Sequence, residues 1–374
     1  RVGSPASTAT FRTIALHADT AYTLLYTKYT AFEPGQFAFE RLLAIAGDTN
    51  AGMLYADRYL LKNGNSQQAP VIDYQKGSLR DDFDFGSLLF FRSSVLKQAV
   101  RAMDADSRFA GLYGLRLRVS ELAELVHVNE YLYSEVETDI RKSGEKLFDY
   151  VDPKNRAVQI EMEAVCTAYL KRVGGYLAPD FEPVTFDAGG FEQEASVIIP
   201  VRNRIRTIED AIRSVLAQKT TFRFNLIIVD NHSTDGTSEA IEKYTADGRV
   251  VHLVPERSDL GIGGGWNVGV HHPACGKFAV QLDSDDVYSG PDTLQKIVDA
   301  FYEQNCAMVV GTYRMTDFKM NEIPPGIIDH REWTLENGRN NALRINGLGA
   351  PRAFYTPVLR RINLPNTSYG EDYA

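Results

Sequence analysis

The sequence predicts two α/β domains, the second with a mostly parallel sheet flanked by helices. Two observations favour this class. From residue 195 onward, short apolar runs alternate with amphipathic stretches, and the polar motifs directly follow the apolar runs. The length of 374 residues also suits about two domains of ~150 residues. Buried strands that alternate with helices build a mostly parallel sheet, which binds ligands at the carboxyl ends of its strands.

Composition restricts the class of protein. The net charge of −9 argues against a nucleic-acid-binding protein, which normally has a basic face. The three cysteines, Cys166, Cys275 and Cys306, lack metal-ligand spacing and indicate reduced thiols, as in the cytoplasm. No apolar run approaches the ~18 residues of a transmembrane helix. Because the chain begins at Arg1 and stops inside a motif at Ala374, we expect it to be a fragment.

The chain divides into three regions. The first alternates helical and strand-like patterns. Residues 153–173 have apolar positions at helical spacing and predict one amphipathic helix, which Gly174 ends. Residues 176–193 are rich in Pro, Gly and acids and predict a linker. The expected division is therefore 1–152 for a first domain, 153–193 for helix and linker, and 194–374 for a second domain.

After the linker, apolar runs predict buried strands and amphipathic stretches predict helices. The predicted strands are 195–200, 225–229, 250–254, 278–282 and 306–310, with a further strand and loop at 343–355. The predicted helices are 207–218, 237–244 and 293–303. Thr207 is the expected N-cap of the first of these helices, and acids occupy its first turn.

The segment Asp283-Ser284-Asp285-Asp286 is the sharpest motif, because it directly follows a predicted strand. Carboxylates two residues apart on such a loop can converge on one hard cation. Mg²⁺ and Mn²⁺ prefer oxygen ligands of this kind, together with substrate phosphates. The metal would neutralise charge that develops on a diphosphate leaving group. For this short motif taken alone, a solvated acidic turn is the commoner explanation.

Four segments set this motif in a longer pattern: SVIIPVRNRIRTIEDAIRSVLAQ, LIIVDNHSTDGT, DLGIGGGWNVG and QLDSDD, in that order. Together they resemble glycosyltransferase family 2, over about half of the chain. The family pattern is a strand ending in Pro and Asn, a helix ending in S-V-L-x-Q, a strand ending in V-D-D-G-S-T-D-G-T, an N-x-G stretch and D-x-D. This chain departs at Asn231-His232 and at Asp259, which affects the nucleotide-base preference rather than the fold. The resemblance implies a GT-A fold.

The resemblance also implies the ligands and their contacts. The donor would be a nucleoside-diphosphate sugar, with Mg²⁺ or Mn²⁺ as the cofactor. Donor contacts would come from Pro200, Val201, Arg202, Asp230, Asn231, Asn267, Asp283 and Ser284, and metal contacts from Asp283 and Asp285. For Asp230, a role in an Asx turn or helix cap is the alternative.

The glycines around Trp266 invite a dinucleotide-binding interpretation. The GxGxxG pattern fails, because Trp266 fills its final position. We interpret Gly261 and Gly263–Gly265 as a loop that lets the backbone approach a ligand, with a purely structural loop as the alternative.

The segment Tyr369-Gly370-Glu371-Asp372-Tyr373 resembles the acidic pair that holds the catalytic base in this family. An inverting transfer needs one carboxylate to take the proton of the acceptor hydroxyl. Asp372 is the expected base, and Glu371 is its alternate or a positioning residue. His330, Trp333 and Gly349 are expected to contact a carbohydrate or lipid-linked acceptor, although packing is the alternative for the His and the Trp.

The first half resembles a degenerate copy of the second. Pairing Met53 with Met308 aligns PGQFAFERLLAIAGDTNAGMLYA with PDTLQKIVDAFYEQNCAMVVGTY, and FAGLYGLRLRVS resembles the region of GEDYA. Residues 21–32 and 108–120, where the metal and base motifs would fall, contain no carboxylate. We therefore expect a partial GT-A-like domain without metal or base chemistry. Coincidence of two common helix–strand units is the alternative.

These expectations combine into an inverting sugar transfer in polysaccharide or glycoconjugate synthesis, at the membrane surface if the acceptor is lipid-linked. A nucleotidyltransferase shares the architecture but usually needs a Gly-rich triphosphate loop in its first strand–helix unit, which this sequence lacks. A non-catalytic carbohydrate- or protein-binding module is the other alternative. The intact DSDD and GED motifs argue against it for the second half, and their loss favours it for the first.

Overall fold

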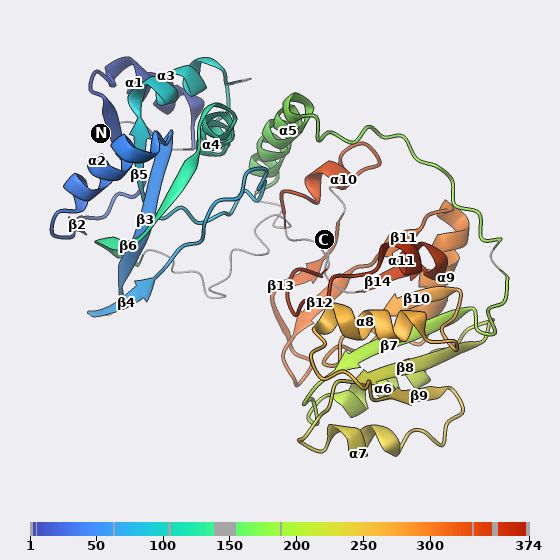
Figure 1. Cartoon of the computed structure of the whole chain (residues 1–374). Coiled ribbons are helices and arrows are strands. Elements are labelled where there is room, and N and C mark those ends of the chain that lie inside the picture. The colour runs from blue at the N-terminus through green and yellow to red at the C-terminus, as the bar shows by residue number, and fades with distance from the viewer. Residues whose placement is uncertain are drawn as a thin grey trace. The chain divides into compact units, whose positions relative to one another are not determined.

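The computed structural model describes residues 3–4, 6–62, 64–103, 106–137, 155–187, 189–330, 333–345 and 351–371. The chain forms two compact units (Figure 1), which consist of residues 1–179 with 331–346 and of residues 180–330 with 347–374. Each unit has its own sheet and its own apolar core. Among the described residues, no helix is long and apolar enough to cross a membrane.

The first unit is built on a six-stranded mixed sheet. Its strands are β1 (Tyr22–Tyr26), β2 (Phe32–Pro34), β3 (Met53–Lys62), β4 (Asn65–Ala69), β5 (Leu88–Arg92) and β6 (Leu125–Val136). The main path has the order β1-β5-β3-β6-β2, and β4 pairs with β3. β5 runs antiparallel to both β1 and β3, whereas β3 and β6 are parallel.

Helices cover both faces of this sheet. They are α1 (Thr8–His17), α2 (Ala38–Thr49), α3 (Ser93–Arg101) and α4 (Gly111–Leu122). Outside them, α5 (Arg156–Val173) packs on α4, and α10 (Gly338–Asn341) packs on α5. Leu42 of α2 packs on one face, and Phe11 of α1 and Leu96 of α3 pack on the other. α5 confirms the helix predicted at 153–173, and Gly174 ends it at a left-handed φ of 76°.

Part of the first unit comes from far along the chain. Residues 331–346 lie in sequence between two strands of the second unit, yet they fold with the first. Arg344 is only 1% exposed, and its guanidinium donates to Asp81 and, at 2.8 Å, to Gln159. A buried charge is costly unless it is paired and hydrogen-bonded, so this network holds the segment in the first unit.

The second unit contains a six-stranded sheet in the order β11-β14-β10-β7-β8-β9. Its strands are β7 (Ala195–Val201), β8 (Phe224–Asp230), β9 (Val250–Leu253), β10 (Phe278–Gln281), β11 (Met308–Val310) and β14 (Arg352–Tyr355). β7 is parallel to β8 and β10, and β8 is parallel to β9. The predicted mostly parallel sheet is therefore confirmed. β14 runs antiparallel to β10 and β11, between which it is inserted.

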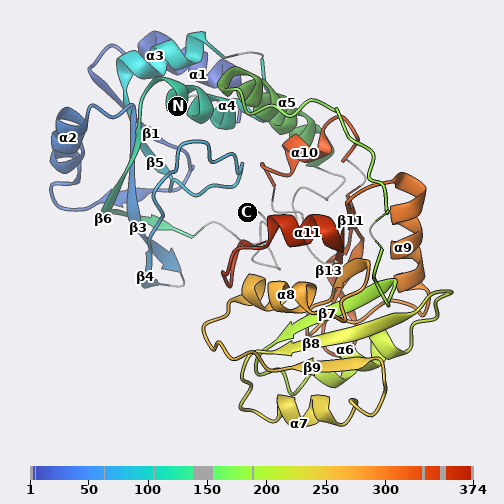
Figure 2. The ribbon, with the colours of Figure 1, turned by 45° about the vertical axis from the view of Figure 1, so that its right-hand side comes forward.

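Helices cover both faces of the second sheet as well. They are α6 (Ile208–Leu216), α7 (Thr237–Glu242), α8 (Ile262–His271), α9 (Thr293–Gln304) and α11 (Thr356–Ile362). α6, α7 and α9 pack on one face, and α8 and α11 pack on the other (Figure 2). A separate hairpin consists of β12 (Tyr313–Thr316) and β13 (Glu322–Ile328).

Candidate functional site

Three parallel strands bring the polar motifs to one edge of the second sheet. Val201 at the end of β7 pairs with Asp230 at the end of β8, and Gln281 at the end of β10 pairs with Ile198. Parallel strands end at the same edge, which is the edge where such sheets bind ligands. Donor-binding residues predicted from separate parts of the sequence therefore meet here.

The expected metal ligands follow β10 on an exposed loop. The side chain of Asp285 is 49% exposed, and its carboxylate lies 4.0 Å from the guanidinium of Arg204. Partial burial, together with the charges of Asp283 and Asp285, raises the pKa of Asp286 to about 7, although this residue still has an exposed edge. Repulsion between crowded carboxylates is the condition that a bound divalent cation relieves.

The donor set suits a cation that also binds substrate. Among the described residues, no group of three or more His, Cys, Asp or Glu side chains is arranged to hold a metal. Asp283 and Asp285 alone would leave several positions of an octahedral ion open. Mg²⁺ typically fills such positions with water and substrate phosphates. The chemistry of the residues therefore fits a diphosphate-bound metal better than a metal held by the protein alone.

Asp230 lies at the predicted place but is bonded within the protein. Its carboxylate is fully buried, accepts the Ser233 N–H at 3.0 Å and accepts the hydroxyl of Ser238. Burial raises the pKa of Asp230, but the bonds from Ser238 and Ser233 outweigh burial and lower it below its ordinary value. The carboxylate thus stabilises the loop after β8, in the turn role that was the alternative for this residue.

Two expected donor-binding amides also bond to backbone. The side chain of Asn267 donates to the carbonyl of Leu364 at 2.6 Å and accepts the Leu364 N–H at 3.0 Å. The side chain of Asn231 donates to the carbonyl of Leu260 at 2.7 Å. Arg202 is exposed on the loop after β7. Each residue lies in the predicted region, and the two amides connect loops that are distant in sequence.

Glu371 is linked to the strand that carries the metal motif. Its carboxylate lies 3.9 Å from the guanidinium of Arg352, which donates to the side chain of Gln281 at 2.5 Å. All three residues are buried, with less than 9% of each exposed. A buried carboxylate that is paired in this way suits a positioning role. Asp372, the expected base, lies outside the described residues.

The glycines before Trp266 are helical, so their assignment to a loop was wrong. Gly263, Gly264 and Gly265 form the first turn of α8. A Cβ on Gly263 would lie 2.0 Å from the carbonyl oxygen of Pro365, and one on Gly269 would lie 2.5 Å from Ile198. Glycine occurs here because the chain's own backbone crosses the start of α8, and because α8 packs tightly on β7. Tertiary packing therefore overrides the poor helix propensity of glycine.

Gly263→Ala is expected to destabilise the second unit. Alanine favours a helix over glycine by about 1 kcal/mol, but the new methyl group would meet a backbone carbonyl that cannot rotate away. Overpacking typically costs about 1–3 kcal/mol, so strain should exceed the gain. Urea denaturation would measure the change. Gly248→Ala is the matched control, because a Cβ there meets nothing within 4 Å; equal stability of the two variants would contradict the close approach.

The expected acceptor residues belong to different units of the chain. His330 belongs to the second unit, whereas Trp333 belongs to the inserted segment of the first. Burial lowers the pKa of His330, which favours the neutral imidazole. Gly349 lies outside the described residues.

Three residues near the site were not identified from the sequence: Arg204, Gln281 and Arg352. A signal for Arg352 does exist, because an arginine beside the apolar strand residues AFY needs a buried acceptor. Nothing local points to Gln281 as its partner. Arg204 is one of three arginines in the loop after β7, and only the fold shows which of them lies near Asp285.

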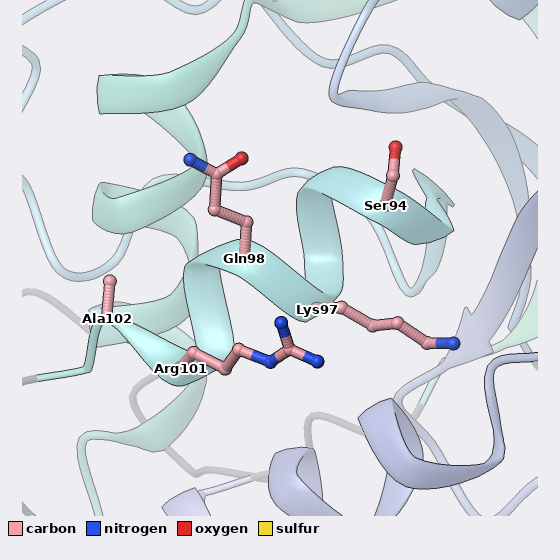
Figure 3. Close-up of a pocket in the computed structure, with 5 residues that line it drawn as sticks. All are labelled: Ser94, Lys97, Gln98, Arg101 and Ala102. Carbon is pink, nitrogen blue, oxygen red and sulfur yellow. The ribbon is translucent and has the colours of Figure 1, made fainter.

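The structure also has a hollow away from this site. It has a volume of about 550 Å³ and lies along α3 in the first unit, where Ser94, Lys97, Gln98, Arg101 and Ala102 line it (Figure 3). None of the predicted site residues lines this hollow.

Comparison with known proteins identifies the second unit. The model of glycosyl transferase family 2 matches residues 196–361, which run from β7 into α11. TuaG of Bacillus subtilis strain 168, provisionally named a teichuronic acid biosynthesis glycosyltransferase, is 33% identical over 120 residues, covering 32% of this chain and 46% of TuaG. An uncharacterised glycosyltransferase of Haemophilus influenzae is 26% identical over 165 residues, which cover 44% of this chain and 48% of that protein. The chain thus spans less than half the length of these relatives.

Solved structures resemble about half of the chain. A crystal structure of S. aureus TarS residues 1–349 is 26% identical, covers 48% of this chain and 53% of its own, and has a TM-score of 0.39. The structure of the same protein in complex with UDP-GlcNAc covers 46% of this chain and 48% of its own, with a TM-score of 0.38. The family match therefore shows a glycosyl transferase family 2 domain at residues 196–361.

Proposed function

We propose that this chain carries an inverting GT-A glycosyltransferase, which moves a sugar from a nucleoside-diphosphate sugar to a hydroxyl group of an acceptor. One observation carries the proposal. Glu371 is linked through Arg352 to Gln281, which lies two residues before Asp283. Glu371, the described member of the acidic pair suited to base catalysis, therefore lies near the strand end that leads to the acidic pair suited to a metal. An inverting transfer needs both functions at the reacting centre.

Each carboxylate of the site has its own proposed role in the transfer. Asp283 and Asp285 would hold Mg²⁺ or Mn²⁺, which when bound offsets the negative charge of the departing diphosphate. Asp372 takes the proton of the acceptor hydroxyl while its oxygen forms a bond to the anomeric carbon. The bond from that carbon to the diphosphate oxygen breaks, and the diphosphate leaves with the electron pair. Glu371, buried beside Arg352, orients the segment rather than taking the proton.

The nucleotide base would be recognised mainly by backbone. Because the Asp230 carboxylate already accepts bonds from Ser233 and Ser238, it has little capacity left for a base N–H. The backbone of Pro200 and Val201 at the end of β7, with the exposed side chain of Arg202, would supply the contacts instead. The side-chain oxygen of Asn231 is buried and has no hydrogen-bond partner among the described residues, which makes it a further acceptor for a base N–H.

The name of TuaG suggests the class of product. A relative provisionally named for teichuronic acid biosynthesis supports a polysaccharide or related glycoconjugate as the acceptor for this chain. Screening nucleoside diphosphates and their sugar conjugates for Mn²⁺-dependent thermal stabilisation tests the donor assignment, because a ligand of the native state raises its apparent stability. No stabilisation by any nucleoside diphosphate with Mn²⁺ would contradict the proposed function.

We further propose that residues 1–152 are a degenerate, partial copy of the same fold. In each unit, one strand lies between two others and antiparallel to both: β5 between β1 and β3, and β14 between β10 and β11. The registers also correspond. The paired positions are Tyr22↔Arg92 and Met53↔Phe91 in the first sheet, and Phe278↔Tyr355 and Met308↔Phe354 in the second.

The helices and the joining hydrogen bonds support the same relation. The Ser93 N–H donates to the Ala21 carbonyl at 3.0 Å, and the Thr356 N–H donates to the Lys277 carbonyl at the same distance. These bonds join the start of α3 to β1 and the start of α11 to β10. In the first unit, α2 covers one face of the sheet, and α1 and α3 cover the other. In the second unit, α9 covers one face, and α8 and α11 cover the other. Coincidence would have to reproduce the order of these three strands, their register and the covered faces together, although the two sheets continue differently beyond them.

The first unit has ion pairs at the place that corresponds to the proposed metal ligands of the second unit. β1 leads into Lys28, which pairs with Glu135 at 2.9 Å. Glu135 is fully buried and also lies 2.9 Å from the guanidinium of Arg58. Two cations already neutralise this carboxylate, so it offers no site for a divalent cation. The first unit would therefore act in acceptor binding or assembly rather than in catalysis.

This assignment predicts one nucleotide per chain. Titration calorimetry with Mn²⁺ and the stabilising nucleoside diphosphate should give a single site, contributed by the second unit. Asp285→Ala should leave no residual Mn²⁺-dependent site, because Lys28 would repel the metal in the first unit. Two sites per chain, or a site that survives Asp285→Ala, would contradict the inactive copy.

A further inference from the structure

We infer that the turn between β12 and β13, residues 317–321, binds the surface of an anionic lipid bilayer. The side chains of Phe318 and Met320 in this turn are 77% and 63% exposed. Ile323 and Ile327 on β13 are exposed as well. Single exposed apolar residues are ordinary, but several large ones on one short hairpin mark a surface that binds a partner.

The turn is rigid, so these exposures are built into the fold. The Asp317 carboxylate accepts the N–H of Lys319 at 2.8 Å and the N–H of Asn321 at 2.9 Å. Its other oxygen accepts the Asn321 side chain at 3.0 Å. Met320 has a φ of 63°, in the left-handed region that favours glycine. The hydrogen bonds of Asp317 therefore hold a strained turn that keeps Phe318 and Met320 in solvent.

The charges around the turn favour anionic lipid as the partner. Lys319 lies between the two apolar side chains, and the Arg206 guanidinium lies 5.3 Å from the centre of the Phe318 ring. Asp317 is engaged in the turn, and Glu322 is paired with Arg314 at 2.7 Å. Arg206, Arg314 and Lys319 together outnumber Asp317 and Glu322, so the turn and its surroundings have a net charge of +1 on a chain whose net charge is −9. Aromatic and apolar side chains beside basic ones suit the headgroup region of a membrane.

The turn also lies beside the candidate active site. Arg206, which contacts Phe318, is two residues from Arg204, which lies 4.0 Å from Asp285. A membrane bound at the turn would therefore be close to the metal-binding loop. This step rests on the proposed function: the acceptor would be a sugar carried on a lipid, delivered from the bilayer to the site.

Co-sedimentation with lipid vesicles tests the inference on the whole chain. The probes are vesicles of phosphatidylcholine and phosphatidylglycerol in equal amounts, and vesicles of phosphatidylcholine alone. We expect binding to the anionic vesicles that weakens as salt is added. The double variant Phe318→Ser with Met320→Ser should lower the partition coefficient at least about tenfold, because it removes the inserted apolar area. Lys319→Glu should weaken binding to the anionic vesicles and leave any binding to the phosphatidylcholine vesicles unchanged.

The matched control removes equally exposed apolar residues from the first unit. Leu16→Ser with Ile72→Ser, at 77% and 71% exposure, should bind vesicles as the wild type does. Three results would overturn the inference: no binding by the wild type, unchanged binding by the Phe318 and Met320 variant, or loss of a dimer in that variant without lipid. The last result would assign the turn to a second copy of the chain. Mn²⁺-dependent nucleotide binding, measured without vesicles, tests the proposed function separately.

Discussion

Replacing Asp285 by alanine is expected to abolish Mn²⁺-dependent binding of nucleoside diphosphates while the fold persists. The side chain is about half exposed, and it pairs with Arg204 at 4.0 Å, so its loss should cost little stability. Mutation of a residue that only hydrogen-bonds to a metal ligand typically lowers the metal affinity roughly 10- to 100-fold. Loss of one of two carboxylate ligands should cost at least as much. Calorimetric titration with and without EDTA would measure the metal-dependent part.

The titration with EDTA matters because Asp285→Ala also releases Arg204. A guanidinium freed from its carboxylate can bind the diphosphate directly, so binding that persists in the presence of EDTA is metal-independent and does not count against the metal assignment. Asp299→Ala is the matched control, since Asp299 is an exposed carboxylate on α9 with a single hydrogen bond, to Gln295. Unchanged Mn²⁺-dependent affinity in Asp285→Ala would refute the metal assignment.

Replacing Asp372 by asparagine is expected to lower turnover at least about 100-fold while donor binding persists. A positioned general base contributes roughly 10²–10⁴-fold, and asparagine cannot take a proton. The proposed donor contacts lie on other loops, so the affinity for nucleoside diphosphate with Mn²⁺ should stay within the wild-type range. Steady-state kinetics of the full-length protein, together with titration calorimetry, would measure the two quantities.

Glu371→Gln separates positioning from proton transfer. Glutamine keeps the shape but weakens the contact with Arg352, so we expect a smaller loss of turnover than in Asp372→Asn. Near-normal turnover in Asp372→Asn with a large loss in Glu371→Gln would exchange the two roles. Near-normal turnover in both variants would remove the base from this segment.

Local sequence patterns predicted most of the second sheet. β7, β8, β9 and β10 lie within a residue or two of the predicted strands, as α6 and α9 do for the predicted helices. These elements are encoded by apolar runs and by helical periodicity, which are properties of neighbouring residues. The order of the four motifs was also sufficient to identify the family. Asp283 and Asp285 were identified for the same reason, because strand and motif are contiguous.

The sequence of α8 shows where local patterns fail. A Gly-Gly-Gly run predicts a loop, because glycine is a poor helix former. The helix forms nevertheless, since only glycine lets α8 approach β7 and the backbone of Pro365 so closely. Asp230 is a similar case. Its strand-end position predicted a ligand contact, and only the fold shows that its carboxylate also bonds to Ser233 and Ser238.

The sequence by itself determined the family, the parallel strands and the carboxylates expected to hold a metal. Only the tertiary structure decided which distant residues complete the site and which unit each segment joins. Arg352 meets Gln281 and Glu371, and Arg344 carries a segment of the second half into the first unit through Asp81. The physical reason is the same in both cases. A buried guanidinium must find hydrogen-bond acceptors, and those acceptors are chosen by proximity in the folded chain rather than in the sequence.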